Sequence, residues 1–161
     1  MADLGDAVAD KLAELDPDHA DDYSANAAVL RSDLEELDGE YAARLASCTR
    51  DTVVVSHDAF GYLAKYGLHL EPIAGLSPGA EPTPDDLGRL QTLIKDKGIT
   101  TVFSETLASP KMSETLAGDL GIATAVLDPL EGLTEEASDS DEDYLSIMRA
   151  NLSALEKANG C

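Results

Sequence analysis

The sequence predicts an α/β fold, in which a mostly parallel sheet of about four strands is flanked by helices and preceded by a long helix. Short apolar runs recur along the chain, and residues 53–55 are three consecutive valines. Such β-branched runs are typical of strands that are covered on both faces. Segments with apolar residues at helical spacing separate these runs. Strands that alternate with helices favour parallel pairing, because each helix carries the chain back to the same edge of the sheet.

Two helices are expected before the sheet. Residues 3–15 have apolar side chains at helical spacing, and Asp16 and Pro17 end this segment and favour the start of the next one. A long helix is expected over residues 17–46, because a single apolar seam continues through it: Tyr23, Ala27, Leu30, Leu34, Leu37, Tyr41 and Leu45. We therefore assign residues 1–47 to the two helices and residues 48–161 to one α/β lobe.

Strands and helices alternate through the lobe. Thr83 or a neighbour is expected to cap the helix that begins at Pro84, and Gly98 follows its end, as is typical of helix termini. Loops are expected at 75–83 and 131–143. The strands are predicted at 52–55, 68–74, 99–103 and 124–127, and the helices at 59–66, 84–97, 109–120 and 144–158.

Polar side chains follow three of the predicted strands at their carboxyl ends. His57 follows the first strand, Glu105 the third and Asp128 the last. In open α/β sheets ligands bind outside this edge, and imidazole and carboxylate groups bind zinc. Structural alternatives exist for each residue. His57 could belong to a helix-capping segment, Glu105 could cap backbone amides, and Asp128 could start an Asp-Pro turn.

The charge of the chain excludes several functions. Its 11 basic and 32 acidic residues give a formal net charge of −21. Binding of nucleic acid depends on clustered Lys and Arg, so no nucleic-acid partner is expected. The sequence has no Ser–His–Asp or Cys–His set, no G-x-G-x-x-G and no Walker loop. We therefore predict that the chain is not an enzyme, with acid–base chemistry at the strand ends as a remote alternative.

Four motifs occur in order between residues 52 and 133: SHDAFGYL, LSPGAEPTPDDL, TTVFSETLASPK and TAVLDPLEGL. Together they resemble the carboxyl-terminal lobe of the metal-binding solute-binding proteins of ABC transporters, in the zinc-type (ZnuA-like) branch. Members of this family have two α/β lobes joined by one long helix and hold metal in the cleft. The resemblance implies that residues 17–46 are the inter-lobe helix and that the family's first lobe is absent from this sequence.

The resemblance also implies a metal site. His57 and Asp128 would bind the metal directly, and Glu105 would orient an imidazole or bind the metal itself. Zinc is expected because His57 supplies a nitrogen donor, with manganese and iron as alternatives. Two direct ligands are too few for a tight zinc site, so the chain is expected to carry half of the site. The implied function is zinc capture for an ABC permease.

Family members are exported as periplasmic proteins or cell-surface lipoproteins. An extracytoplasmic location is therefore expected for the full-length protein, although residues 1–6 do not resemble a signal peptide. In that compartment Cys48 and Cys161 are expected to form a disulfide, with free thiols as the alternative. The part of the long helix that would cover the first lobe should be exposed, which predicts self-association.

A function from a different class is the alternative to metal transport. In this interpretation the chain is an acidic scaffold domain that binds a protein partner and needs no metal. The two other histidines do not favour either function. His19 lies among carboxylates at a helix start and His69 lies within a predicted strand, and both are expected to be solvated.

Overall fold

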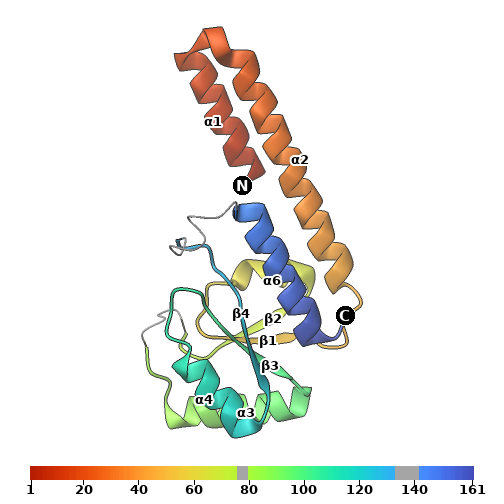
Figure 1. Ribbon diagram of the computed structural model, residues 1–161, viewed down its shortest axis with the longest axis vertical. Coiled ribbons are helices and arrows are strands. Elements are labelled where there is room, and N and C mark those ends of the chain that lie inside the picture. Colours follow the sequence, from red (N-terminus) through yellow and green to blue (C-terminus); the bar gives the residue numbers. More distant parts are fainter. Residues whose placement is uncertain (76–79, 133–141) are drawn as a thin grey trace. The chain divides into compact units, whose positions relative to one another are not determined.

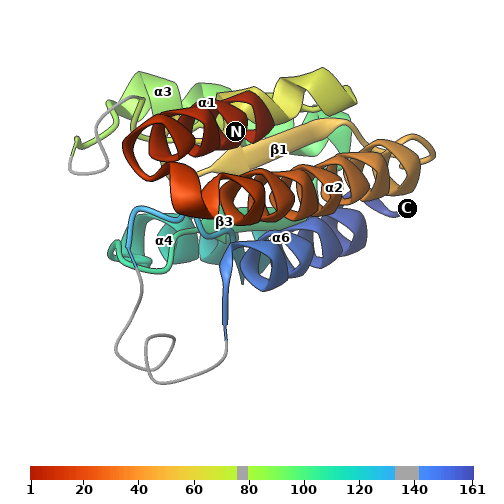
Figure 2. The ribbon, with the colours of Figure 1, turned by 90° about the horizontal axis from the view of Figure 1, so that it is seen from above.

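The structure is a computed structural model, and it describes residues 1–75, 80–132 and 142–161. The chain divides into two compact units, Met1–Ala42 and Ala43–Cys161. The first unit contains α1 (Ala2–Leu15), the 3₁₀ helix η1 (Pro17–His19) and most of α2 (Ala20–Leu45). Figure 2 shows α1 and α2 side by side as a helical hairpin. Both helices were predicted, and the break between them lies at Asp16 and Pro17 as expected.

Arg31 of α2 ties the hairpin together. Its guanidinium donates hydrogen bonds to Asp6 and, at 2.6 Å, to Asp3, and both carboxylates belong to α1. These bonds raise the pKa of Arg31 and lower the pKa of Asp3. The exposure predicted for the amino-terminal part of the apolar seam is found only in part, since Leu30 is 42% exposed whereas Tyr23 and Ala27 are half-buried. Leu30 also lines an apolar groove between the two helices.

The second unit is built on a four-stranded parallel sheet with the order β2-β1-β3-β4. The register places Thr52 opposite His69 and Val102 opposite Thr124. The chain first adds β2 on one side of β1 and then adds β3 and β4 on the other side. The order in which strands are added therefore reverses between β1 and β3. The strands are β1 (Thr52–Val55), β2 (His69–Pro72), β3 (Thr101–Ser104) and β4 (Ala123–Val126).

Helices cover both faces of the sheet. Figure 1 shows α3 (Pro84–Lys97) and α4 (Lys111–Leu120) on one face and α6 (Tyr144–Asn159) on the other. Because every residue of β1 is buried, this strand appears in the sequence as a continuous apolar run. The predicted fold class is confirmed. The core on the α3 and α4 face contains Val54, Ile73, Leu90, Ile94, Ile99, Val102, Leu116 and Ala117.

The ends of α3 agree with the sequence signals. The Thr83 side chain accepts a hydrogen bond from the Asp86 N–H, and the Asp86 side chain accepts one from the Thr83 N–H. This reciprocal pair satisfies two of the donors that every helix start leaves unpaired. Gly98 ends the helix with φ of 61°, in the left-handed region that favours glycine.

The segment after β1 differs from its prediction. A helix was expected over 59–66, but the structure has a shorter 3₁₀ helix, η2 (Gly61–Tyr66). The Asp58 N–H donates to the Gly75 carbonyl and the Ala59 N–H to the His57 carbonyl, at 2.7 and 3.0 Å. The helix begins only at Gly61, with the 3₁₀ hydrogen bond from the Leu63 N–H to the Phe60 carbonyl at 2.9 Å. Of the two predicted loops, residues 76–79 and 133–141 lie outside the described part of the chain.

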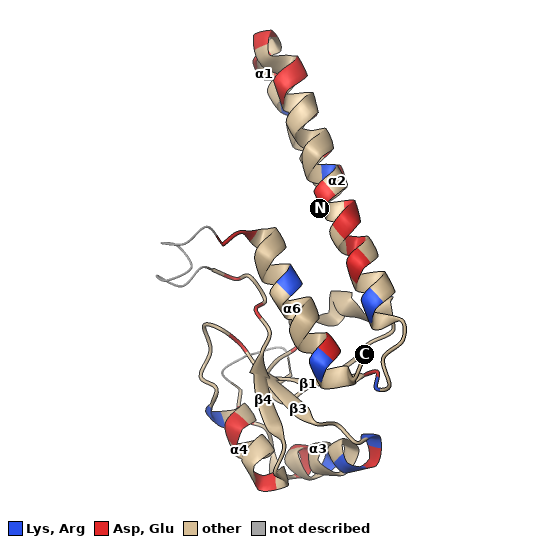
Figure 3. Cartoon of the chain, turned by 45° about the vertical axis from the view of Figure 1, so that its right-hand side comes forward, with Lys and Arg blue, Asp and Glu red and all other residues tan. Residues whose placement is uncertain are grey.

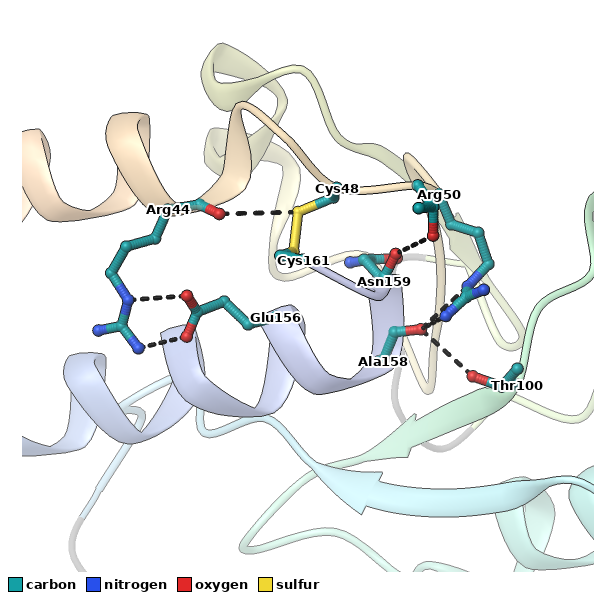
Figure 4. Close-up of a disulfide and its surroundings, with 9 residues drawn as sticks. Arg44, Cys48, Arg50, Thr100, Glu156, Ala158, Asn159 and Cys161 are labelled. Atoms are coloured by element: carbon teal, nitrogen blue, oxygen red, sulfur yellow. Dashed lines mark hydrogen bonds and ion pairs between the residues drawn. A yellow bond between two sulfur atoms is a disulfide. The ribbon is translucent and has the colours of Figure 1, made fainter.

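The carboxyl end of α6 is joined covalently to the segment before β1. Cys48 and Cys161 form a disulfide across 113 residues of sequence, which confirms the predicted pairing (Figure 4). Arg44, at the end of α2, forms an ion pair with Glu156 on the same side. The first and last segments of this unit are therefore held together.

Hydrogen bonds to the last carbonyls of α6 reinforce this junction. The Arg50 guanidinium donates to the Ala158 carbonyl at 2.9 and 3.1 Å, and Thr100 donates to the same oxygen at 3.2 Å (Figure 4). The Asn159 carbonyl accepts from Thr49 Oγ1 at 2.9 Å and from the Arg50 N–H at 3.0 Å. A helix leaves its final carbonyls without partners of its own, and these donors satisfy them.

Acidic residues occur in both units, as the colouring of Figure 3 shows. In the described part of the chain, no helix combines the length and apolarity that a transmembrane helix requires.

Candidate metal centre

The candidate site lies at the carboxyl ends of the two central strands. Ser56 and His57 follow β1, and Glu105 follows β3, the neighbouring strand. The two strands are parallel, but the chain adds β2 on one side of β1 and β3 on the other, so the strand order reverses between them. Ligands of open α/β sheets bind in the crevice outside this point, where the connecting segments diverge and leave space.

A buried hydrogen-bonded cluster holds His57. The residue is only 4% exposed, and its Nδ1 contacts the Oε1 atom of Glu105, which is 6% exposed. The same carboxylate oxygen accepts a hydrogen bond from the Ser56 hydroxyl. When this carboxylate accepts the Nδ1–H bond, Nε2 is the ring nitrogen that can bind a metal. The cluster therefore presents Nε2 as a nitrogen donor in a fixed orientation.

Glu131 stands in front of this nitrogen. Its Oε1 lies 3.8 Å from His57 Nε2, and its side chain is 61% exposed. Two ligands that are each about 2.0–2.2 Å from a tetrahedral zinc ion lie roughly 3.3–3.6 Å apart. The observed separation is thus close to that of two ligands of one ion. Sequence analysis missed Glu131 because it belongs to a predicted loop, although it is part of the motif that contains Asp128.

Asp128 follows β4, the edge strand beside β3. Its Oδ1 accepts a hydrogen bond from the Leu130 N–H at 2.7 Å, and its Oδ2 accepts one from the Thr106 hydroxyl at 2.8 Å. Leu130 has φ of 60°, a backbone conformation that is uncommon outside glycine. The Asp128 carboxylate therefore stabilises a tight turn, which is the alternative considered for an Asp-Pro pair. Its predicted role as a direct ligand stays a prediction.

Asn151 of α6 pairs with the backbone of Asp128. Its Oδ1 accepts the Asp128 N–H at 2.9 Å, and its Nδ2 donates to the Asp128 carbonyl at 2.8 Å. Asn151 is 5% exposed, so both bonds are shielded from water. No signal in the sequence singled out this asparagine, because the contact joins residues that are 23 positions apart.

A small pocket of about 100 Å³ is lined by the three acidic residues Glu105, Asp128 and Glu131. Within residues 1–75, 80–132 and 142–161, no group of three or more His, Cys, Asp or Glu side chains converges as a metal site would require. The pocket is lined by Glu105, Leu107, Ala108, Asp128, Pro129 and Glu131.

The other two histidines are solvated, as predicted. The side chain of His19 is 61% exposed, with its Nδ1 2.9 Å from Asp16 Oδ2. The side chain of His69 is 71% exposed, with its Nε2 3.8 Å from Asp51 Oδ2. Each has one exposed carboxylate nearby, whereas His57 is buried and oriented.

Comparison with known proteins matches this chain to zinc-binding and zinc-uptake proteins. The sequence model of the family described as "ZnuA: Zinc-uptake complex component A periplasmic" matches residues 1–158. The zinc-binding protein AdcA of Streptococcus pyogenes serotype M1 is 40% identical over 149 residues, which are 92% of this chain and 29% of that protein. The high-affinity zinc uptake system protein ZnuA of Bacillus subtilis is 39% identical over 147 residues, or 91% of this chain and 46% of that protein.

Solved structures of similar proteins share the fold of this chain. The laminin-binding protein Lbp of Streptococcus pyogenes superposes with a TM-score of 0.84 at 35% identity, covering 94% of this chain and 59% of that one. The Zn(II)-bound ZnuA-like domain of Streptococcus pneumoniae AdcA superposes with a TM-score of 0.78 at 38% identity, covering 96% and 58%. The chain spans less than half the length of the two curated relatives. It belongs to the ZnuA family of zinc-uptake components.

Proposed function

We propose that this chain supplies one half of a zinc-binding cleft in a solute-binding protein that delivers zinc to an ABC permease. The orientation of His57 is the observation that carries the proposal. Its Nδ1 is held by a buried carboxylate, and its Nε2 faces an exposed one. The zinc-binding names of the relatives support the choice of metal. A nitrogen donor also favours zinc, while manganese and iron remain alternatives.

In this proposal His57 and Glu131 bind zinc directly, and Glu105 orients the imidazole. Asp128 is a further predicted ligand, because a carboxylate can bind an ion while it keeps hydrogen bonds on its other lone pairs. The remaining ligands would come from the first lobe of the family. Residues 1–47 would then form the inter-lobe segment, and residues 48–161 would form the second lobe. Zinc would be captured and released unchanged, without catalysis.

The proposed setting is outside the cytoplasm. Family members are periplasmic or cell-surface proteins, and a disulfide persists in an oxidising compartment. The Cys48–Cys161 bridge agrees with that location for the full-length protein. The permease is the proposed partner. Self-association through the exposed apolar groove of the α1–α2 hairpin also remains a proposal.

Calorimetric titration with zinc tests the ligand assignment. Replacing Glu131 with glutamine keeps its size and removes its charge, and we expect the zinc affinity to fall by on the order of a hundredfold. For Asp128→Asn we expect a smaller loss of about tenfold, because the asparagine oxygen can still accept the Leu130 N–H and can still bind an ion. Glu114→Gln, an exposed acid on α4, is the control and should leave the affinity unchanged.

Two results would contradict the ligand assignment, and a third would contradict the proposed function. Unchanged affinity in Glu131→Gln together with a large loss in Asp128→Asn would make Asp128 the direct ligand. Zinc binding that survives both substitutions would place the metal elsewhere. Absence of zinc binding in the wild-type chain, and also in the chain joined to a first lobe of the family, would favour the alternative of an acidic scaffold domain that needs no metal.

A further inference from the structure

We infer that Asn151 is a positioning residue, which sets where Glu131 stands relative to His57 and thereby tunes the affinity for zinc. This inference rests on the proposed zinc site and adds to it a residue of α6 that touches no proposed ligand atom. It follows from a chain of hydrogen bonds that leads from the buried face of α6 to the turn after β4.

The first link is the amide of Asn151. It bonds to the backbone N–H and the backbone carbonyl of Asp128, at 2.9 and 2.8 Å, as a neighbouring strand would. Its Nδ2 also lies 3.9 Å from the Met148 sulfur, within the buried face of the helix. Because β4 is an edge strand and mostly exposed, this buried side chain holds the chain at the point where the strand ends.

The second link is the turn itself. With its backbone held, Asp128 directs its Oδ1 to the Leu130 N–H at 2.7 Å. Leu130 then has the left-handed conformation with φ of 60°, and the next residue is Glu131. The orientation of each residue depends on the one before it. Asn151 therefore fixes the backbone from which the Glu131 side chain extends.

The third link is the anchoring of α6. Its carboxyl end is joined to the segment before β1 by the disulfide and by the hydrogen bonds to the Ala158 and Asn159 carbonyls. His57 follows β1, and Glu131 is held through α6. Because α6 and β1 are joined at this junction, the two proposed ligands are held by connected parts of the structure. A metal site needs its ligands held within a fraction of an ångström, and outer partners that hold them typically change the affinity by about 10–100-fold.

The test compares two buried asparagines of one helix. Asn151→Ala removes the bonds to Asp128, whereas Asn159→Ala removes a side chain that is 2% exposed and whose Nδ2 has no partner among the described residues. We expect Asn151→Ala to weaken zinc binding about tenfold in calorimetry, and Asn159→Ala to leave it within about twofold. Equal losses in both variants would overturn the inference, because they would reflect general loosening of α6.

A double-mutant cycle separates positioning from stability. In a Glu131→Gln background, Asn151→Ala should lower the zinc affinity by no more than about twofold, since the group that it positions is already lost. The same tenfold loss in both backgrounds would overturn the inference. If Asn151→Ala does not fold, as judged by thermal unfolding, Asn151→Asp replaces it in the cycle. This variant keeps an acceptor for the Asp128 N–H and loses the donor to the Asp128 carbonyl.

The outcomes also separate this inference from the proposed function. If zinc binds normally to His57→Ala, or if the chain binds no zinc even when a first lobe of the family is joined to it, the site fails and the role of Asn151 fails with it. If His57 and Glu131 are both required but Asn151→Ala binds zinc like the wild type, only the positioning role is wrong.

Discussion

Replacing His57 with alanine is expected to lower the zinc affinity of this chain by at least about a hundredfold, because the substitution removes the nitrogen donor of the proposed site. The wild-type imidazole is buried, and Glu105 holds its Nδ1, so little rotational freedom is lost when Nε2 binds the ion. Calorimetric titration of zinc into both proteins under identical conditions measures the difference. The stoichiometry also shows whether two chains share one ion.

Stability must be followed in the same experiment. His57→Ala leaves the buried Glu105 carboxylate with Ser56 as its remaining partner in the cluster, and a buried charge that loses a partner destabilises a fold. His57→Gln is the matched variant, because its amide can donate to Glu105 while the imidazole is lost. We expect His57→Gln to unfold at a temperature close to that of the wild type and still to lose zinc affinity. Normal zinc binding in this variant would contradict the role of His57.

The two exposed histidines provide controls of the same residue type. His19→Ala and His69→Ala each remove an imidazole whose side chain is more than half exposed. We expect both variants to bind zinc within about twofold of the wild type, since exposed histidines without converging ligands bind zinc weakly. A loss confined to His19→Ala would move the metal to the end of η1 and would refute the proposed site.

Loss of the disulfide is expected to produce the largest change in stability. For Cys48→Ser combined with Cys161→Ser, the free energy of unfolding should fall by up to about 4–5 kcal/mol. The bridge spans 113 residues, so it removes many conformations from the unfolded chain. Chemical denaturation of the variant, and of the wild type with and without a reductant, measures the change. The reductant should destabilise the wild type and leave the variant unaffected.

The native structure should survive this substitution. The Arg50 and Thr49 bonds to the last carbonyls of α6 remain, and so does the ion pair between Arg44 and Glu156. The disulfide lies before the amino end of β1, whereas the candidate site follows its carboxyl end. Zinc affinity should therefore be unchanged at temperatures where the variant is folded. A change in stability below about 1 kcal/mol would show that the unfolded chain is already constrained at this junction.

Much of the fold could be predicted from local patterns. The valines of β1, the capping residues of α3 and the seam of α2 report structures whose spacing recurs over a few residues, so short windows contain the signal. The segment after β1 was mispredicted as a regular helix, because its structure depends on contacts with residues far away in the sequence. The hydrogen bond from Asp58 to the carbonyl of Gly75 joins distant positions, and no local pattern reports it.

The candidate site was likewise predictable in part from local patterns and in part only from long-range contacts. The carboxyl ends of parallel strands meet at one edge of the sheet, so the alternation of strands and helices was enough to bring His57 and Glu105 under consideration. Strand order is set by long-range packing, and it made these two residues neighbours. The approach of Glu131 to His57 depends on an uncommon backbone conformation at Leu130 and on the amide of Asn151. Distances of this kind arise when segments far apart in the chain pack together, because a linear pattern encodes periodicity and carries no direct measure of separation in space.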